Sequence, residues 1–112
     1  MNRSELREFE TLILSRLEEL ERNSLAGQDA QSVVELDQQA VGRLSRMDAL
    51  QNQAMAKAQQ TRRDLEARRL RAALDRMAEG EFGYCEDCGD DIPRRRLDLD
   101  PAASECVSCA AG

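Results

Sequence analysis

Four cysteines near the end of the chain have the spacing of a metal site. They form two Cys-x-x-Cys pairs, Cys85 with Cys88 and Cys106 with Cys109, and 17 residues separate the pairs. Thiolates at this spacing are typical ligands of tetrahedral zinc, and Gly89 permits the tight turn that follows the second ligand. A catalytic zinc keeps one position open for water, whereas here the protein fills all four. We therefore expect one structural Zn²⁺ bound by these four cysteines.

Two other interpretations of the cysteines stay open at this point. Iron bound by four thiolates uses a similar spacing, and a pair of disulfides would require an oxidising compartment. The first twenty residues carry charged side chains from Arg3 on, and they contain no apolar run long enough for a signal peptide. No segment reaches the length of about 18 apolar residues expected of a membrane span. A cytoplasmic location is therefore expected, and reduced, metal-bound cysteines are favoured.

The composition restricts how the rest of the chain can fold. Of its 112 residues only 3% are aromatic, none is tryptophan, and 34% are charged. Such a chain cannot form a thick globular core. It needs long helices that share a narrow apolar seam, together with a local cross-link such as a metal ion. We expect an all-α fold: an antiparallel helical hairpin over residues 1–79, followed by a small four-cysteine zinc finger over residues 80–112.

The hairpin is predicted to consist of two helices of unequal length. The first covers residues 4–22, where apolar residues recur every three or four positions. A loop is expected at residues 23–32, which contain Asn, Gly, Asp and Ser. Ser32 and Glu35 then fit a capping box at the start of a second helix over residues 33–79, so the tip of the hairpin is placed at about residues 23–36. The apolar positions of the first helix are Leu6, Phe9, Ile13, Leu17 and Leu20.

The second helix contains a seven-residue rhythm that predicts a coiled-coil seam. Gly42 lowers the helix propensity there, and Ser45 with Asp48 forms another possible capping box, so the helix is expected to bend or fray near Gly42. Close to the cysteines the apolar stripe shifts to Leu70, Leu74 and Met77. The predicted seam consists of Ala40, Leu44, Met47, Gln51, Ala54, Ala58, Thr61, Leu65, Arg68 and Ala72.

The finger resembles a known family. The sequence from Glu81 to Cys109 is similar to the zinc finger of the DksA/TraR family of bacterial transcription regulators, in the motif Phe82-Gly83-Tyr84-Cys85 and in Ile92-Pro93, Arg96-Leu97 and Pro101. The order of hairpin and finger is also that of the family. The resemblance implies a protein that binds RNA polymerase, with the hairpin entering the secondary channel so that its tip approaches the catalytic magnesium. It also makes Arg94, Arg95 and Arg96 candidates for docking contacts on the rim of the channel.

The hairpin tip departs from the family pattern. The family's tip motif, Asp-x-x-Asp-x-Ala, has no copy in this hairpin. The acidic residues that could stand in for it are Asp29, Glu35, Asp37 and Asp48. Helix capping is the alternative role for these side chains, because negative charge is favoured near a helix N-terminus.

Charge and residue types narrow the possible functions further. The net charge of −6 argues against direct sequence-specific DNA binding, which needs Lys and Arg against phosphates. The chain has no histidine, no nucleophile beside a base and no glycine-rich phosphate loop, so an enzyme is not expected. A DksA-like polymerase regulator that acts as a monomer, with possible involvement of guanosine tetraphosphate, is the main hypothesis. A zinc or redox sensor and a coiled-coil adaptor are the alternatives.

Overall fold

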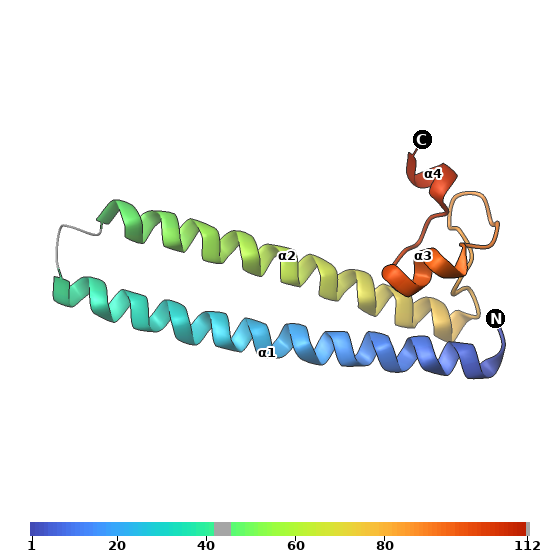
Figure 1. Ribbon diagram of the computed structural model, residues 1–112, viewed down its shortest axis with the longest axis horizontal. Helices are drawn as coiled ribbons and strands as arrows, with labels where there is room; N and C mark the ends of the chain where they lie inside the picture. Colours follow the sequence, from blue (N-terminus) through green and yellow to red (C-terminus); the bar gives the residue numbers. More distant parts are fainter. Residues whose placement is uncertain (42–45, 112) are drawn as a thin grey trace. The chain divides into compact units, whose positions relative to one another are not determined.

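The computed structural model is mostly helical (Figure 1). It describes residues 1–41 and 46–111, and it places the side chains of residues 1–28 and 46–111. The helices are α1 (Arg3–Val41), α2 (Arg46–Glu79), α3 (Arg94–Leu99) and α4 (Val107–Ala111). The chain divides into two compact units. Unit 1 comprises Met1–Leu17 and Ala67–Gly112, and unit 2 comprises Glu18–Glu66.

Within each unit, α1 and α2 run antiparallel and side by side, as Figure 1 shows. Unit 1 joins the beginning of α1 and the end of α2 to the cysteine-rich segment, whereas unit 2 contains only the two helices. The expected all-α hairpin followed by a four-cysteine segment is confirmed.

Local signals fix where the helix pair begins and ends in unit 1. The side chain of Asn2 accepts a hydrogen bond from the backbone N–H of Glu5 at 2.8 Å, which caps the start of α1. At the other end, Gly80 has a φ of +76°. The N–H of Gly80 donates to the carbonyl of Met77, and the N–H of Glu81 donates to the carbonyl of Arg76. This pair of bonds is a Schellman motif, so α2 stops five residues before the first cysteine.

The apolar core lies mostly in unit 1, where side chains from both helices meet those of the finger. The rings of Phe9 and Phe82 lie 5.6 Å apart, between α1 and the segment that follows α2. Ile13 and Leu97 are fully buried. The other buried hydrophobic residues of this unit are Leu70, Ala73, Cys85, Ile92, Ala102 and Ala103.

The apolar stripe predicted for the first helix is confirmed. Phe9, Ile13 and Leu20 are buried, and Leu6 and Leu17 are half-buried. The predicted shift of the stripe in α2 is also observed, because Leu70 is buried and Leu74 and Met77 are half-buried.

The predicted loop at residues 23–32, and with it the tip at residues 23–36, is wrong. α1 continues without interruption to Val41, and the connection between the helices therefore falls between Val41 and Arg46. Asn, Ser and Asp each lower helix propensity by only a fraction of a kcal/mol, and one glycine costs about 1 kcal/mol. Packing against α2 outweighs these costs. The capping box at Ser32 is wrong for the same reason, and Gly42 and Ser45 lie outside the described residues.

The predicted seam of the second helix faces away from α1 and is a second correction. Met47 is 75% exposed and Leu65 is 53% exposed. The inward positions lie about two residues away along the sequence, which is the opposite face of a helix. Alanine occurs on both faces, so the rhythm could not identify the packed one. Less exposed positions on the opposite face include Ala49, Gln53, Ala56, Gln60, Arg63, Leu70 and Ala73; Ala40 and Leu44 lie outside the described side chains.

Among the described residues, no helix has the length and apolar character needed to cross a membrane.

The core of unit 1 leads to a first prediction. Replacing the fully buried Ile13 by alanine should lower the free energy of unfolding by about 2–5 kcal/mol, because it leaves a cavity between the helices. Leu14→Ala is the matched control, since Leu14 is 47% exposed and its loss should change stability by less than about 1 kcal/mol. Urea unfolding followed by circular dichroism measures both. Equal losses for the two variants would contradict the packing of this face.

Candidate metal centre

The first pair of cysteines is held by a tight turn that follows α2 after a five-residue link. The N–H of Gly89 donates to the carbonyl of Cys85 at 2.9 Å, and the N–H of Cys85 donates to the carbonyl of Asp90 at 2.8 Å. Gly89 has a φ of +78°, a conformation that residues with a side chain rarely adopt. The expected role of Gly89 in this turn is confirmed.

The second pair is presented by α4. Cys106 directly precedes this helix and Cys109 lies within it, and the carbonyl of Cys106 accepts a hydrogen bond from the N–H of Ala110. The two pairs are joined by a backbone bond of 2.9 Å from the N–H of Glu86 to the carbonyl of Ser104. The segments that carry the two cysteine pairs are therefore hydrogen-bonded to each other.

The four sulfur atoms converge on one point. All four ligand atoms lie within 4.8 Å of one another, and the Sγ atoms of Cys88 and Cys106 are 3.7 Å apart. Zinc–sulfur bonds of about 2.3 Å in a tetrahedron place the sulfurs about 3.8 Å from each other. All four cysteines are free thiols. The donor set and its spacing therefore fit one zinc ion with four protein ligands.

The cysteine thiols differ in pKa because their surroundings differ. The backbone N–H groups of Cys106 and then Cys88 point at the sulfur of Cys85 and lower its pKa to about 6. Hydrogen bonds with the side chains of Cys106, Cys85 and Cys88 favour the protonated thiol of Cys109 and raise its pKa. For Cys88, the backbone N–H of Asp90 favours the thiolate, but hydrogen bonding with the sulfurs of Cys85 and Cys106 and partial desolvation outweigh it and raise the pKa. Without metal, the cluster can thus hold a thiolate at Cys85 beside protonated thiols.

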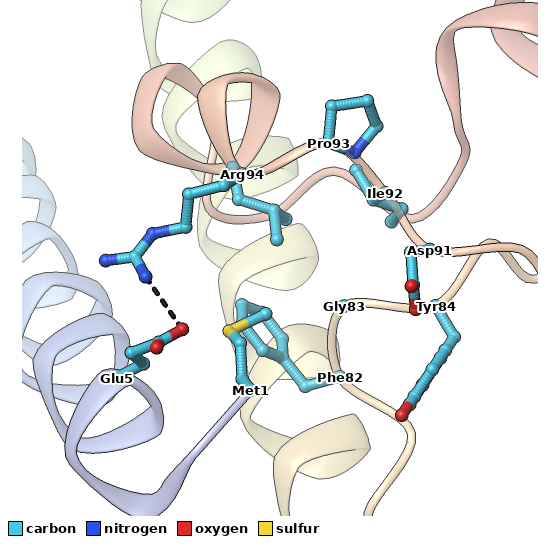
Figure 2. A pocket seen from close by; sticks show the side chains of 10 residues that line it. Met1, Glu5, Phe82, Gly83, Tyr84, Asp91, Ile92, Pro93 and Arg94 are labelled. Carbon is cyan, nitrogen blue, oxygen red and sulfur yellow. Dashed lines mark hydrogen bonds and ion pairs between the residues drawn. The ribbon is translucent and has the colours of Figure 1, made fainter.

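Arg94, at the start of α3, ties the finger to α1. Its guanidinium bonds the carboxylate of Glu5 at 2.8 Å, as Figure 2 shows, and lies 3.6 Å from that of Glu8. The same group sits 4.9 Å from the centre of the Phe9 ring. Arg94 and Glu5 help to line a cavity of about 440 Å³ between the beginning of α1 and the finger. No local sequence pattern predicts this contact, because its partners are 89 residues apart.

The three arginines expected to dock on a partner therefore have different environments. Arg94 is engaged with α1, and the Nε of Arg96 donates to the carbonyl of Glu105 at 3.0 Å. Arg95 is exposed, and no hydrogen bond or ion pair engages it within the part of the chain that is described. Further along the finger, Arg69 of α2 bonds Asp100 at 2.8 Å.

The acidic residues proposed for the tip are not placed together in a loop. Asp29, Glu35 and Asp37 belong to α1, so they do not cap the start of a helix, and their side chains lie outside those that are described. Asp48 lies in the first turn of α2 and is exposed. Asp37 and Asp48 are thus the two that lie within about one turn of the connection between the helices.

Fold and site together define a closed, four-thiolate structural zinc finger at the end of an antiparallel helix pair. Residues 80–112 match the family model of the prokaryotic DksA/TraR C4-type zinc finger.

The similarity to known proteins extends beyond the finger. The chain is 28% identical over 112 residues to the RNA polymerase-binding transcription factor DksA of Salmonella typhimurium, covering 97% of this chain and 71% of that protein. The DksA of Escherichia coli K12 matches to the same extent. The DksA of Haemophilus influenzae is 38% identical over 42 residues. The structure of the transcription factor DksA2 from Pseudomonas aeruginosa superposes with a TM-score of 0.88 at 22% identity, covering 99% of this chain and 84% of that one.

The metal centre gives a second prediction. Cys106→Ser should lose zinc and unfold residues 80–112, because the few apolar side chains of the finger cannot order it alone. Ser108→Ala, at an exposed neighbouring position, should keep zinc and fold normally. Zinc content and finger amide signals in NMR spectra test this. A folded Cys106→Ser finger without metal would contradict a structural role.

The acidities of the thiols give a third prediction. Zinc must displace protons from Cys88 and Cys109, whose pKa values are raised, so zinc affinity should increase steadily from pH 6 to pH 8. Competition with a chromophoric chelator, corrected for the chelator's own protonation, measures the trend. An affinity independent of pH would show that the thiols are already ionised in the metal-free finger.

Arg94 gives a fourth prediction. Arg94→Ala should lower the free energy of unfolding of unit 1 by about 1 kcal/mol, because it removes the ion pairs and the contact with Phe9. The effect should shrink at high salt, which screens exposed ion pairs. Arg95→Ala, on the same helix, is the control and should leave stability unchanged. A loss of the same size in both variants would contradict the role of Arg94.

Proposed function

We propose that this protein is a DksA-like regulator of bacterial transcription that binds RNA polymerase through its secondary channel and modulates initiation. The observation that carries the proposal is the extent of the similarity. The relatives are named RNA polymerase-binding transcription factors, and the alignment with them covers 97% of this chain, helices and finger included. A shared finger alone would support only a shared metal site.

The charge of the chain supports a protein partner. With a net charge of −6 it is poorly suited to hold nucleic acid through phosphates, whereas a protein channel imposes no such requirement. We propose no direct sequence-specific DNA binding, no catalytic activity and no membrane attachment. A cytoplasmic monomer that meets the polymerase in solution is the form to test.

Two groups of residues in this protein are candidates for contact with the polymerase. Arg95 is the docking candidate in the finger, because Arg94 and Arg96 are already engaged within the protein. Asp37 and Asp48 are the candidates for the polymerase-directed tip, because they lie nearest to the connection between α1 and α2. Asp29 and Glu35 lie further back along α1 and are weaker candidates.

The proposal is tested by competition for RNA polymerase. Purified zinc-loaded protein should displace a labelled secondary-channel factor from the polymerase, with half-displacement below tens of micromolar. Absence of displacement at these concentrations would reject the proposed function. Arg95→Ala should weaken binding, whereas Arg62→Ala, which changes an exposed arginine of unit 2, should not.

A transcription assay on a ribosomal-type promoter then addresses the tip. Asp48→Asn should retain binding to the polymerase but reduce the change in transcript yield. The reason is that it removes a charge from the first turn of α2, the end of the helix that we propose enters the channel. Glu21→Gln, an exposed acid of α1, is the matched control. The assay is run with and without guanosine tetraphosphate, and an unchanged response would remove this alarmone from the proposal. Wild-type behaviour of Asp48→Asn in both assays would exclude Asp48 from the tip.

A further inference from the structure

The interface between the two helices in unit 2 is unusually polar. Of the described side chains in this unit only Leu20 and Ala49 are buried apolar ones. The apolar side chains Leu25, Met47, Leu50, Met55 and Leu65 are instead more than half exposed. Apolar interlocking, which sets the alignment of most helix pairs, is therefore weak over this part of α1 and α2.

A hydrogen-bond network takes the place of apolar contacts at the centre of this interface. The Nε2 of Gln60 on α2 donates to the hydroxyl of Ser24 on α1 at 3.0 Å and to the carboxylate of Asp64 at 2.9 Å. The Oε1 of Gln60 accepts from the Nε of Arg63 at 3.1 Å. Both donors and one acceptor site of the amide are thus used, and its orientation is fixed from three directions.

Gly27 provides the space that this network needs. A Cβ atom at position 27 would lie 2.8 Å from the Nη2 of Arg63, so the guanidinium occupies the place that a side chain on α1 would otherwise take. Gly27 lies one turn beyond Ser24, on the same face of α1. The glycine and the serine, which argued for a loop in the sequence, thus form a matching surface for Gln60 and Arg63.

We propose that Gln60 is a positioning residue that sets the axial and rotational alignment of α1 and α2 in unit 2 through its bond to Ser24. A polar pair within a helix interface favours the one alignment in which both partners are satisfied, at the expense of stability. The functional part of this inference rests on the proposed function: the alignment determines how the residues around the connection, Asp48 among them, are presented to the polymerase.

The proposal predicts that stability and function change in opposite directions in one variant. Ser24→Ala combined with Gln60→Leu replaces the polar pair by apolar groups, which is expected to be neutral or stabilising. Amide exchange in residues 18–28 and 46–66 should be as slow as in the wild type or slower. The same residues should show doubled or broadened amide signals, because alternative alignments become accessible. Regulation of transcription should fall by at least about fivefold while polymerase binding is retained.

Two further variants provide the controls. Gln59→Leu makes the same substitution at the neighbouring exposed position and should behave as the wild type in every measurement. Ser24→Gln combined with Gln60→Ser exchanges the two groups across the interface and should restore a single set of signals together with part of the regulation.

The remaining outcomes each decide against a part of the proposal. A single set of sharp signals in the apolar variant overturns the alignment role, whatever its stability. Doubled signals with full regulation overturn the positioning of the tip. If the wild type itself does not bind polymerase, the proposed function fails, whereas the amide signals still confirm or overturn the alignment role independently.

Discussion

The convergence of four sulfur atoms on one point is the constraint on which unit 1 depends. Residues 80–112 include two helices of only six and five residues, which are too short to be stable by themselves. A metal ion held by both cysteine pairs would join two segments that are distant in the sequence. Ile92 and Leu97, which lie between these pairs, are buried in the same unit as the aromatic pair Phe9 and Phe82. The ends of the two long helices therefore acquire a core that their own narrow stripe could not supply.

The two units use different physical means for the same helix pair. In unit 1, buried apolar side chains and the contacts of Arg94 hold α1 against α2 and the finger. In unit 2, glutamine, serine, arginine and glycine occupy much of the described interface. Burial of apolar surface gives strength with little directional preference, whereas hydrogen bonds give geometry with little net strength. Unit 1 is thus stabilised by apolar packing, whereas unit 2 has a defined but less heavily packed helix interface.

The parts that could be predicted from the sequence are those with a local chemical signature. The spacing of the cysteines, the stripe from Leu6 to Leu20 and the stop after Glu79 all depend on residues close together in the chain. The expected ligand set and the resemblance of the finger to the DksA/TraR family rest on the same short segments. The contact of Arg94 with Glu5 joins opposite ends of the chain, and no local pattern indicates it.

The two incorrect predictions, the loop at residues 23–32 and the seam of α2, have a common cause. Residues 23–32 carry turn-forming types that an isolated helix tolerates poorly, but Ser24 and Gly27 are used by the partner helix. The seam of α2 was assigned to the face with the clearer apolar rhythm, although Gln60 and Arg63 pack inward. In both cases the packed face is polar, so the usual association of apolar residues with burial gave the wrong answer.

The unequal burial of the four ligands has a kinetic consequence for the metal. Cys85 is 3% exposed and lies beneath the turn, whereas Cys88 is exposed to solvent. A chelator or acceptor protein that approaches from solvent would reach the sulfur of Cys88 before that of Cys85. We therefore expect metal release to begin with exchange of the Cys88 sulfur, while the buried Cys85 sulfur is released later.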